Sequence, residues 1–83
     1  MGHMDLCSVI GSNVRTLRKA KRLSQEELAF RAEIDRSYLS EIENGQKNLS
    51  VLMLDQIAAA LGVDMKELLE GYKRPPRRTG STE

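Results

Sequence analysis

The sequence of 83 residues has one cysteine, one histidine and no tryptophan. A single cysteine, Cys7, cannot form a disulfide within the chain, and Cys7 with His3 is too small a ligand set for a zinc site. The same scarcity leaves no plausible pair of nucleophile and base, so we expect no catalytic activity. We also expect no metal, no cofactor and no small-molecule ligand.

Long apolar runs are absent as well. No segment approaches the roughly 18 consecutive apolar residues of a membrane span, and the chain opens without a charged and then apolar leader. We therefore expect a cytoplasmic protein without a membrane partner. A single domain of this size buries only about 60% of the surface that its unfolded chain exposes, so a partner subunit is a plausible source of stability.

Charge is unevenly placed, although the net charge is only +1. Five basic residues crowd residues 15–22, and we interpret this cluster as a solvated helix face with a modest long-range attraction for phosphate. Residues 73–83 are basic, contain a proline pair and lack apolar periodicity, which predicts a flexible tail. With residues 1–4 set aside as a cloning remnant, we expect one folded domain over residues 5–72.

Helical periodicity begins directly after the remnant. Apolar residues recur at spacings of three and four over residues 6–22, which predicts an amphipathic helix with a cationic last turn. Ser24, followed three residues later by Glu27, forms the S-x-x-E pattern of a capping box and predicts the start of a second helix.

The rest of the domain shows three more helical segments. Asp35 can cap a third helix that stops at Asn44-Gly45, and Ser50 can cap a fourth helix that ends at Gly62. A short fifth helix is expected over residues 65–70. No strand pattern is present, so we predict an all-α fold of five helices.

The second and third helices are expected to be joined by about three residues. This spacing is typical of a helix-turn-helix and also of a plain helical hairpin. Small Ala29 lets the two helices approach each other, and Leu39 and Ile42 seal the angle between them. The outward face of the third helix is polar or amphipathic and could enter a major groove; it comprises Arg36, Ser37, Tyr38, Ser40, Glu41 and Asn44.

Three segments with this spacing, LSQEELAFRAEIDRSYLSEIENG, LSVLMLDQIAAALGV and ELL, resemble the Cro and phage-repressor, or XRE-type, helix-turn-helix regulators. Within that family, DRSYLSEIENGQKNLS is similar to controller proteins of restriction-modification systems, with Asn48-Leu49-Ser50 where most of the family has Asn-Pro-Ser. The resemblance implies a transcriptional regulator of bacterial or phage cytoplasm that binds double-stranded DNA as a homodimer on a palindromic operator.

The resemblance also implies roles for single residues. Gln25 matches a residue that bonds a DNA phosphate, while Arg18 and Glu43 match an internal ion pair between the first and third helices. The residues that match base-reading positions are Arg36, Ser37 and Tyr38, with Ser40 and Glu41 one turn later. The loop that matches a contact with the sugar-phosphate backbone comprises Asn44, Gln46, Lys47 and Asn48.

Packing alternatives stay open for some of these side chains. The ring of Tyr38 could instead pack over the helix junction, and Glu41 could bond a partner within the chain or face solvent. Arg36 could be a solvated surface arginine, although in a major groove it could bond O6 and N7 of guanine.

The end of the domain carries more apolar residues than a short helix needs to cover the core. Some of them should be exposed in a monomer, and such a patch is typical of an interface. We predict a homodimer interface formed by Leu61, Val63, Met65, Leu68, Leu69 and Tyr72. A two-fold dimer would place two recognition helices about 34 Å apart, one turn of DNA.

Two other functions fit the same sequence. One is an antitoxin or phage-type repressor whose C-terminal half binds a protein partner. The other is a protein-interaction adaptor that keeps the helix-turn-helix but does not bind DNA. Binding that weakens steeply with salt would distinguish a DNA-binding regulator from an adaptor.

Overall fold

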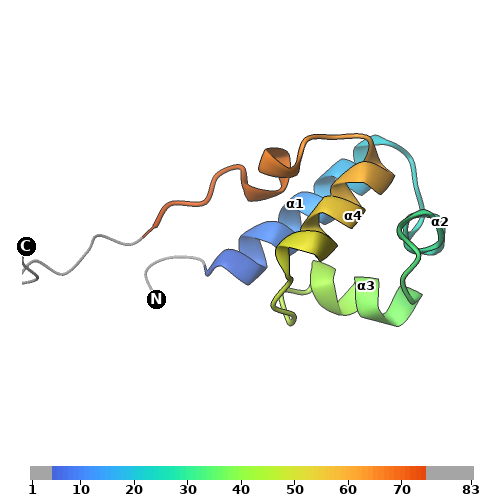
Figure 1. Cartoon of the computed structure of the whole chain (residues 1–83), viewed down its shortest axis with the longest axis horizontal. Coiled ribbons are helices and arrows are strands. Elements are labelled where there is room, and N and C mark those ends of the chain that lie inside the picture. The colour runs from blue at the N-terminus through green and yellow to red at the C-terminus, as the bar shows by residue number, and fades with distance from the viewer. Residues whose placement is uncertain (1–4, 75–83) are drawn as a thin grey trace, which may run out of the picture.

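The computed structural model describes residues 5–74 and consists of helices joined by short loops (Figure 1). The predicted all-α class is confirmed, and residues 5–74 contain no strand. The elements follow the chain in the order α1 (Leu6–Ala20), α2 (Gln25–Ala32), α3 (Arg36–Glu43), α4 (Val51–Leu61) and the 3-10 helix η1 (Met65–Leu69). The predicted remnant, residues 1–4, lies outside the described residues, as does the predicted tail of residues 73–83 except for residues 73 and 74.

The predicted fifth helix is the one element whose type differs. η1 is a 3-10 helix, in which the Glu67 N–H donates to the Asp64 carbonyl at 2.9 Å. Five residues are too few to offset the cost of nucleating an α-helix, whereas a 3-10 turn closes with bonds between residues three apart. The fold is therefore four α-helices and one 3-10 helix.

Side-chain caps determine where three of the α-helices begin. Ser24 Oγ accepts a hydrogen bond from the Glu27 N–H at 3.0 Å, and the Glu27 carboxylate accepts one from the Ser24 N–H at 2.8 Å, so the predicted capping box is present. Ser50 Oγ accepts from the Met53 N–H at 3.1 Å at the start of α4, and Asp5 caps α1 in the same way. Each such cap typically stabilises a protein by about 1 kcal/mol.

α1 ends two residues before the boundary that periodicity predicted. Arg22 takes a left-handed conformation with φ of 61°. The next residue, Leu23, then donates its N–H back to the Arg18 carbonyl at 3.0 Å and buries its side chain. This reversal turns the chain sharply from α1 into α2.

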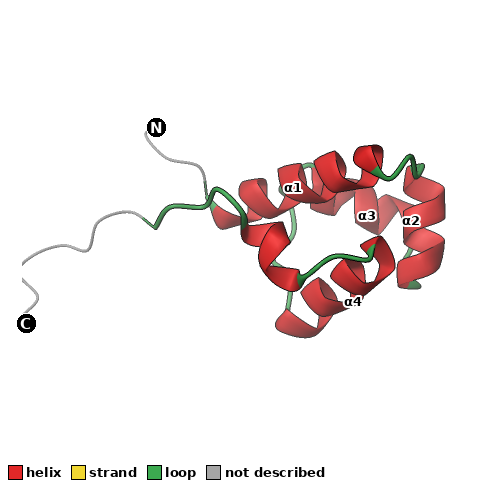
Figure 2. Ribbon diagram, turned by 90° about the horizontal axis from the view of Figure 1, so that it is seen from above, coloured by secondary structure: helices red, strands yellow, loops and turns green. Residues whose placement is uncertain are grey.

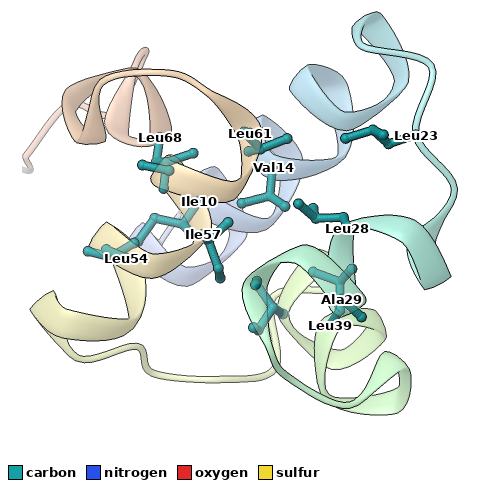
Figure 3. Close-up of a cluster of buried hydrophobic side chains, with 13 residues drawn as sticks. Ile10, Val14, Leu23, Leu28, Ala29, Leu39, Leu54, Ile57, Leu61 and Leu68 are labelled. Carbon is teal, nitrogen blue, oxygen red and sulfur yellow. The ribbon is translucent and has the colours of Figure 1, made fainter.

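One hydrophobic core joins all the elements (Figure 3). Leu61 and Leu68 belong to this core, with 3% and 0% of their surface exposed. The prediction that these two residues form a dimer interface is wrong, because packing within one chain already buries them. η1 is held against α1 by Asn13, whose Nδ2 donates to the carbonyls of Leu68 at 2.8 Å and Glu70 at 2.9 Å.

α1 and α3 approach each other closely at Gly11. A Cβ atom at this position would clash with the carbonyl oxygens of Ile42 and Glu43, so the absence of a side chain permits the contact. The last turn of α3 is thereby fixed against the middle of α1. Figure 2 shows α2 at one end of the molecule and the start of α1 at the other.

Within residues 5–74, none of the helices is both long and apolar enough to cross a membrane.

Candidate nucleic-acid interface

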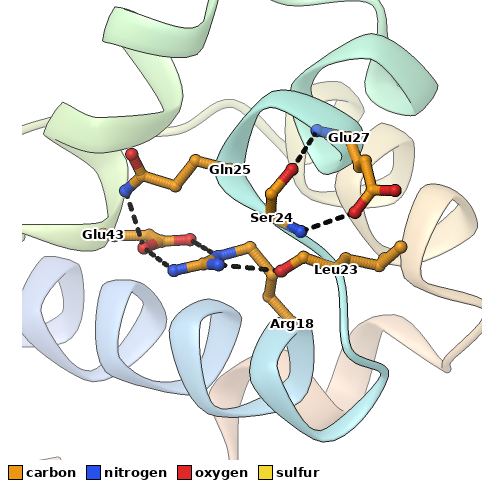
Figure 4. Close-up of polar contacts among 6 residues, drawn as sticks. All are labelled: Arg18, Leu23, Ser24, Gln25, Glu27 and Glu43. Atoms are coloured by element: carbon orange, nitrogen blue, oxygen red, sulfur yellow. Dashed lines mark hydrogen bonds and ion pairs between the residues drawn. The ribbon is translucent and has the colours of Figure 1, made fainter.

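The inner side of α3 is held by an ion pair between Arg18 and Glu43 (Figure 4). Arg18 Nε lies 2.7 Å from Glu43 Oε2, and Arg18 Nη2 donates to Glu43 Oε1 at 3.1 Å. Arg18 Nη1 also donates to the Leu23 carbonyl at 2.8 Å, so the guanidinium joins α1, α3 and the turn before α2. Both residues are buried, and fork-shaped pairing of this kind offsets much of the cost of burying two charges. The pair that the resemblance implied is thus present.

Gln25 extends this ion pair to the first turn of α2. Its Nε2 donates to Glu43 Oε1 at 3.0 Å. The sequence predicts Gln25 at a DNA phosphate and gives no sign of this bond, which depends on how α2 and α3 are packed. An amide nitrogen carries two N–H groups, so the bond to Glu43 leaves the second N–H of Gln25 for another acceptor.

The turn between α2 and α3 sets the angle at which α3 leaves the core. Glu33 takes a left-handed conformation with φ of 61°, and the following Ile34 N–H donates to the Ala29 carbonyl at 2.9 Å. A non-glycine residue with positive φ is uncommon, and nothing in the sequence signals it, because glutamate has no preference for this conformation.

The outer side of α3 is polar, as predicted, and is only partly engaged within the chain. Arg36, Ser37, Glu41 and Asn44 are exposed, and Ser40 is half-buried. Among residues 5–74, only one of these five side chains has a polar side-chain partner. It is Glu41, whose Oε1 lies 3.4 Å from Lys47 Nζ in the loop that follows α3. The N-terminal half of this face is therefore free for an external partner.

Tyr38 and Lys47 connect the second half of α3 to the loop that follows it. The ring of Tyr38 is half-buried against the core, and Lys47 Nζ lies 5.9 Å above its centroid. The same Lys47 pairs with Glu41. The free protein thus shows the alternative that was left open for each residue. Tyr38 packs at the helix junction, and Glu41 has a partner within the chain.

The loop after α3 is exposed at Gln46, Lys47 and Asn48. It is fastened to the start of α1 by Cys7, whose Sγ–H donates to Asn48 Oδ1 at 3.0 Å. This attachment places the predicted backbone-contacting residues beside the end of α3. Sequence reasoning missed the role of Cys7, since 41 residues separate the two partners.

The predicted dimer interface is reduced by the burial of Leu61 and Leu68. Leu69 is 37% exposed, and the remaining members, Val63, Met65 and Tyr72, are half-buried. The apolar side chains with the greatest exposure lie elsewhere, on α2 at Phe30 (84%) and on α4 at Val51 (67%) and Leu52 (79%). Among residues 5–74, no group of three or more His, Cys, Asp or Glu side chains is arranged to hold a metal ion.

Comparison with known proteins places these features in one family. The helix-turn-helix family HTH_3 matches residues 14–68, which include all of α2, α3 and α4. The chain is 42% identical over 71 residues to the control protein C.MunI of Mycoplasma, a match that covers 84% of this chain and 96% of C.MunI.

Solved structures show the same likeness. The restriction-modification controller protein C.AhdI from Aeromonas hydrophila is similar with a TM-score of 0.72 and 44% identity, covering 75% of this chain and 94% of C.AhdI. A second controller protein, C.Esp1396I, was crystallised as a tetramer in complex with its natural 35 base-pair operator. It is similar with a TM-score of 0.70 and 31% identity, covering 81% of this chain and 99% of C.Esp1396I.

Proposed function

The chain belongs to the helix-turn-helix family HTH_3, with controller proteins among its relatives, and from this premise we propose that it regulates transcription by binding a palindromic operator as a homodimer. The observation that carries the proposal is the difference between the two sides of α3. Its inner side is fixed by a buried ion pair, while its outer side begins with exposed polar residues.

A fixed inner side matters because binding costs less when the contacting surface is already ordered. Arg18, Glu43 and Gln25 connect α1, α3 and α2, so α3 is offered to DNA at one angle. Arg36 can reach a groove without a movement of the helix, since it stands on the first, exposed turn of α3.

Arg36 is the residue that we assign to base reading, with Ser37 and Tyr38 beside it. Its guanidinium can bond O6 and N7 of a guanine, a contact worth about 1 to 3 kcal/mol of discrimination. Ser40 lies one turn further along the same helix, with Glu41 next to it. Because Glu41 already pairs with the loop after α3, we expect it to add less to base reading than Arg36 does.

The remaining polar residues are assigned to the sugar-phosphate backbone. Gln25 keeps one amide N–H for a phosphate, and the exposed loop offers donors from Asn44, Gln46, Lys47 and Asn48. Such contacts set the register of the protein on DNA without reading sequence. This set would hold the protein on the chromosome, and so we propose a cytoplasmic protein associated with the nucleoid.

Dimerisation is assigned to the apolar residues that stay accessible around η1, namely Leu69 with Val63, Met65 and Tyr72. Two copies related by a two-fold axis would bring two α3 helices to half-sites about 34 Å apart. The tetramer of C.Esp1396I on its operator is a property of that relative, and it supports an oligomer here. We assign no catalytic activity to the chain.

One selection experiment tests the proposal. Purified protein is used to select duplexes from a randomised pool, and the recovered duplex is then bound at salt concentrations from about 50 to 200 mM. We expect a palindrome with half-sites one helical turn apart and an affinity that falls steeply with salt. A pool that stays random after selection, with no salt-dependent binding, would instead favour the adaptor function.

A further inference from the structure

A hollow of about 610 Å³ lies beside the outer side of α3. It is formed by the second half of α1, the start of α2 and the first residue of α3. Its lining residues are Arg15, Arg18, Lys19, Ser24, Gln25, Glu26 and Arg36. Because Gln25 and Arg36 also belong to the proposed DNA-binding surface, the hollow is continuous with that surface.

The hollow has an excess of positive charge. Arg18 is neutralised by Glu43, but Arg15, Lys19 and Arg36 are exposed and have no carboxylate within 4.0 Å among residues 5–74. Glu26 is the only lining residue that carries a carboxylate. Three cations around one carboxylate make the hollow attractive to an anion.

We propose that Arg15 and Lys19 hold a DNA backbone phosphate in this hollow, so that α1 is part of the DNA-binding surface. The inference rests on the proposed function, since it adds a phosphate contact to the same site. For these two residues the sequence alone indicates a solvated helix face with a modest long-range attraction for phosphate, and no defined phosphate contact. Their position next to Gln25 and Arg36 comes from the fold, which brings together side chains from three helices.

The chemistry of the two cations suits a phosphodiester. An arginine fork can bond two phosphate oxygens at once, and a lysine adds a mobile point charge. In a helix-turn-helix the helix that precedes the recognition helix crosses the DNA backbone, and here the start of that helix, α2, lines the hollow together with Arg36. A phosphate of that backbone is therefore the anion that we assign to the hollow.

The test compares Arg15→Gln and Lys19→Gln with Arg31→Gln. Arg31 is likewise an exposed cation, at the other end of α2, and it lines a separate hollow between α2 and α4. All three changes remove one positive charge from an exposed side chain, so the fold should be kept. The DNA is the duplex recovered by selection, together with an unrelated duplex of equal length.

We expect the double variant Arg15→Gln, Lys19→Gln to lower the slope of log affinity against log salt by about 1.8, because one phosphate contact is lost in each of the two half-sites, and each single variant to lower it by part of that amount. Between about 50 and 200 mM salt, the double variant should lose about twelvefold less affinity than the unchanged protein does. The same change should appear on both duplexes, since a phosphate contact carries no sequence information. Arg31→Gln should keep the original slope.

A neutral methylphosphonate, placed at one phosphate at a time along the selected duplex, locates the contact. One position in each half-site should weaken binding of the unchanged protein but not of the double variant Arg15→Gln, Lys19→Gln. Slopes for Arg15→Gln and Lys19→Gln that equal those of the unchanged protein, or that fall no more than for Arg31→Gln, would overturn the inference alone. If the unchanged protein selects no duplex at all, the proposed function fails and the inference fails with it.

Discussion

α3 and η1 are both attached to the core by one face, but their outward faces differ in chemistry. α3 turns Leu39 and Ile42 inward and carries exposed polar residues on its outer side. η1 turns Leu68 inward and carries Leu69, which is 37% exposed, on its outer side.

The difference indicates two kinds of partner. A polar, partly cationic surface suits the hydrated and charged DNA backbone, whereas accessible apolar residues suit a protein surface that can exclude water. We therefore assign DNA to the outer side of α3 and a second copy of the chain to the outer side of η1. Substitutions of inward and outward residues within the same element test this division.

The largest effect is expected on α3, from Glu43→Ala compared with Glu41→Ala. Removing Glu43 leaves the buried Arg18 without its partner and should lower the free energy of unfolding by about 3 to 5 kcal/mol. Glu41 pairs with Lys47 at the surface, where such a pair contributes about 0 to 1 kcal/mol. Urea denaturation measures both values. Similar costs for the two variants would show that the inner and outer sides of α3 do not differ as described.

The next effect concerns η1. Leu68→Ala should lower the free energy of unfolding by about 2 to 5 kcal/mol, because it opens a cavity in the core. Leu69→Glu should leave a folded chain but place a charge in the proposed dimer interface. Urea denaturation and sedimentation equilibrium together separate loss of folding from loss of the dimer. An intact Leu69→Glu dimer would remove Leu69 from the interface.

These two elements also show how far the sequence alone could predict the structure. α3 ends at the predicted Asn44-Gly45 stop, although Asp35 does not form the side-chain cap that the sequence predicted for its start. The segment is long enough for the spacing of Leu39 and Ile42 to identify the inner face. In η1, five residues make fewer than two turns, so periodicity cannot tell which of the adjacent Leu68 and Leu69 faces the core. The packing of η1 against α1 buries Leu68 and leaves Leu69 on the outer side. A segment this short has no sequence pattern that predicts this packing.

The candidate site divides in the same way. The polar face of α3 follows from its spacing, and the resemblance to helix-turn-helix regulators supplied the Arg18–Glu43 pair. The bond from Gln25 to Glu43 and the hollow beside Arg15 depend on the angle between helices. Periodicity and motif spacing do not give that angle, so neither feature could be predicted from them.

Arg36→Ala tests the outer side of α3 directly. The variant should fold as before, because Arg36 is exposed, but it should lose about 1 to 3 kcal/mol of specific affinity for each half-site. Selection from randomised duplexes should show a relaxed preference at one base position of each half-site. Lys66→Ala, which removes an exposed cation of η1, is the matched control and should keep the preference. An unchanged preference for Arg36→Ala would end its assignment to base reading.

The smallest effect is expected at the turn that orients α3. Glu33 has a φ of 61°, which costs about 1 to 2 kcal/mol for a residue with a Cβ atom. Glu33→Gly relieves this cost but adds freedom to the unfolded chain, so we expect a net gain of about 0.5 to 1 kcal/mol in the free energy of unfolding. Glu33→Ala keeps the Cβ atom and should show no such gain. Because the native φ is kept, α3 should stay at the same angle and operator affinity should not change. Urea denaturation measures the stability of both variants. Equal stability of Glu33→Gly and Glu33→Ala would contradict this account of the turn.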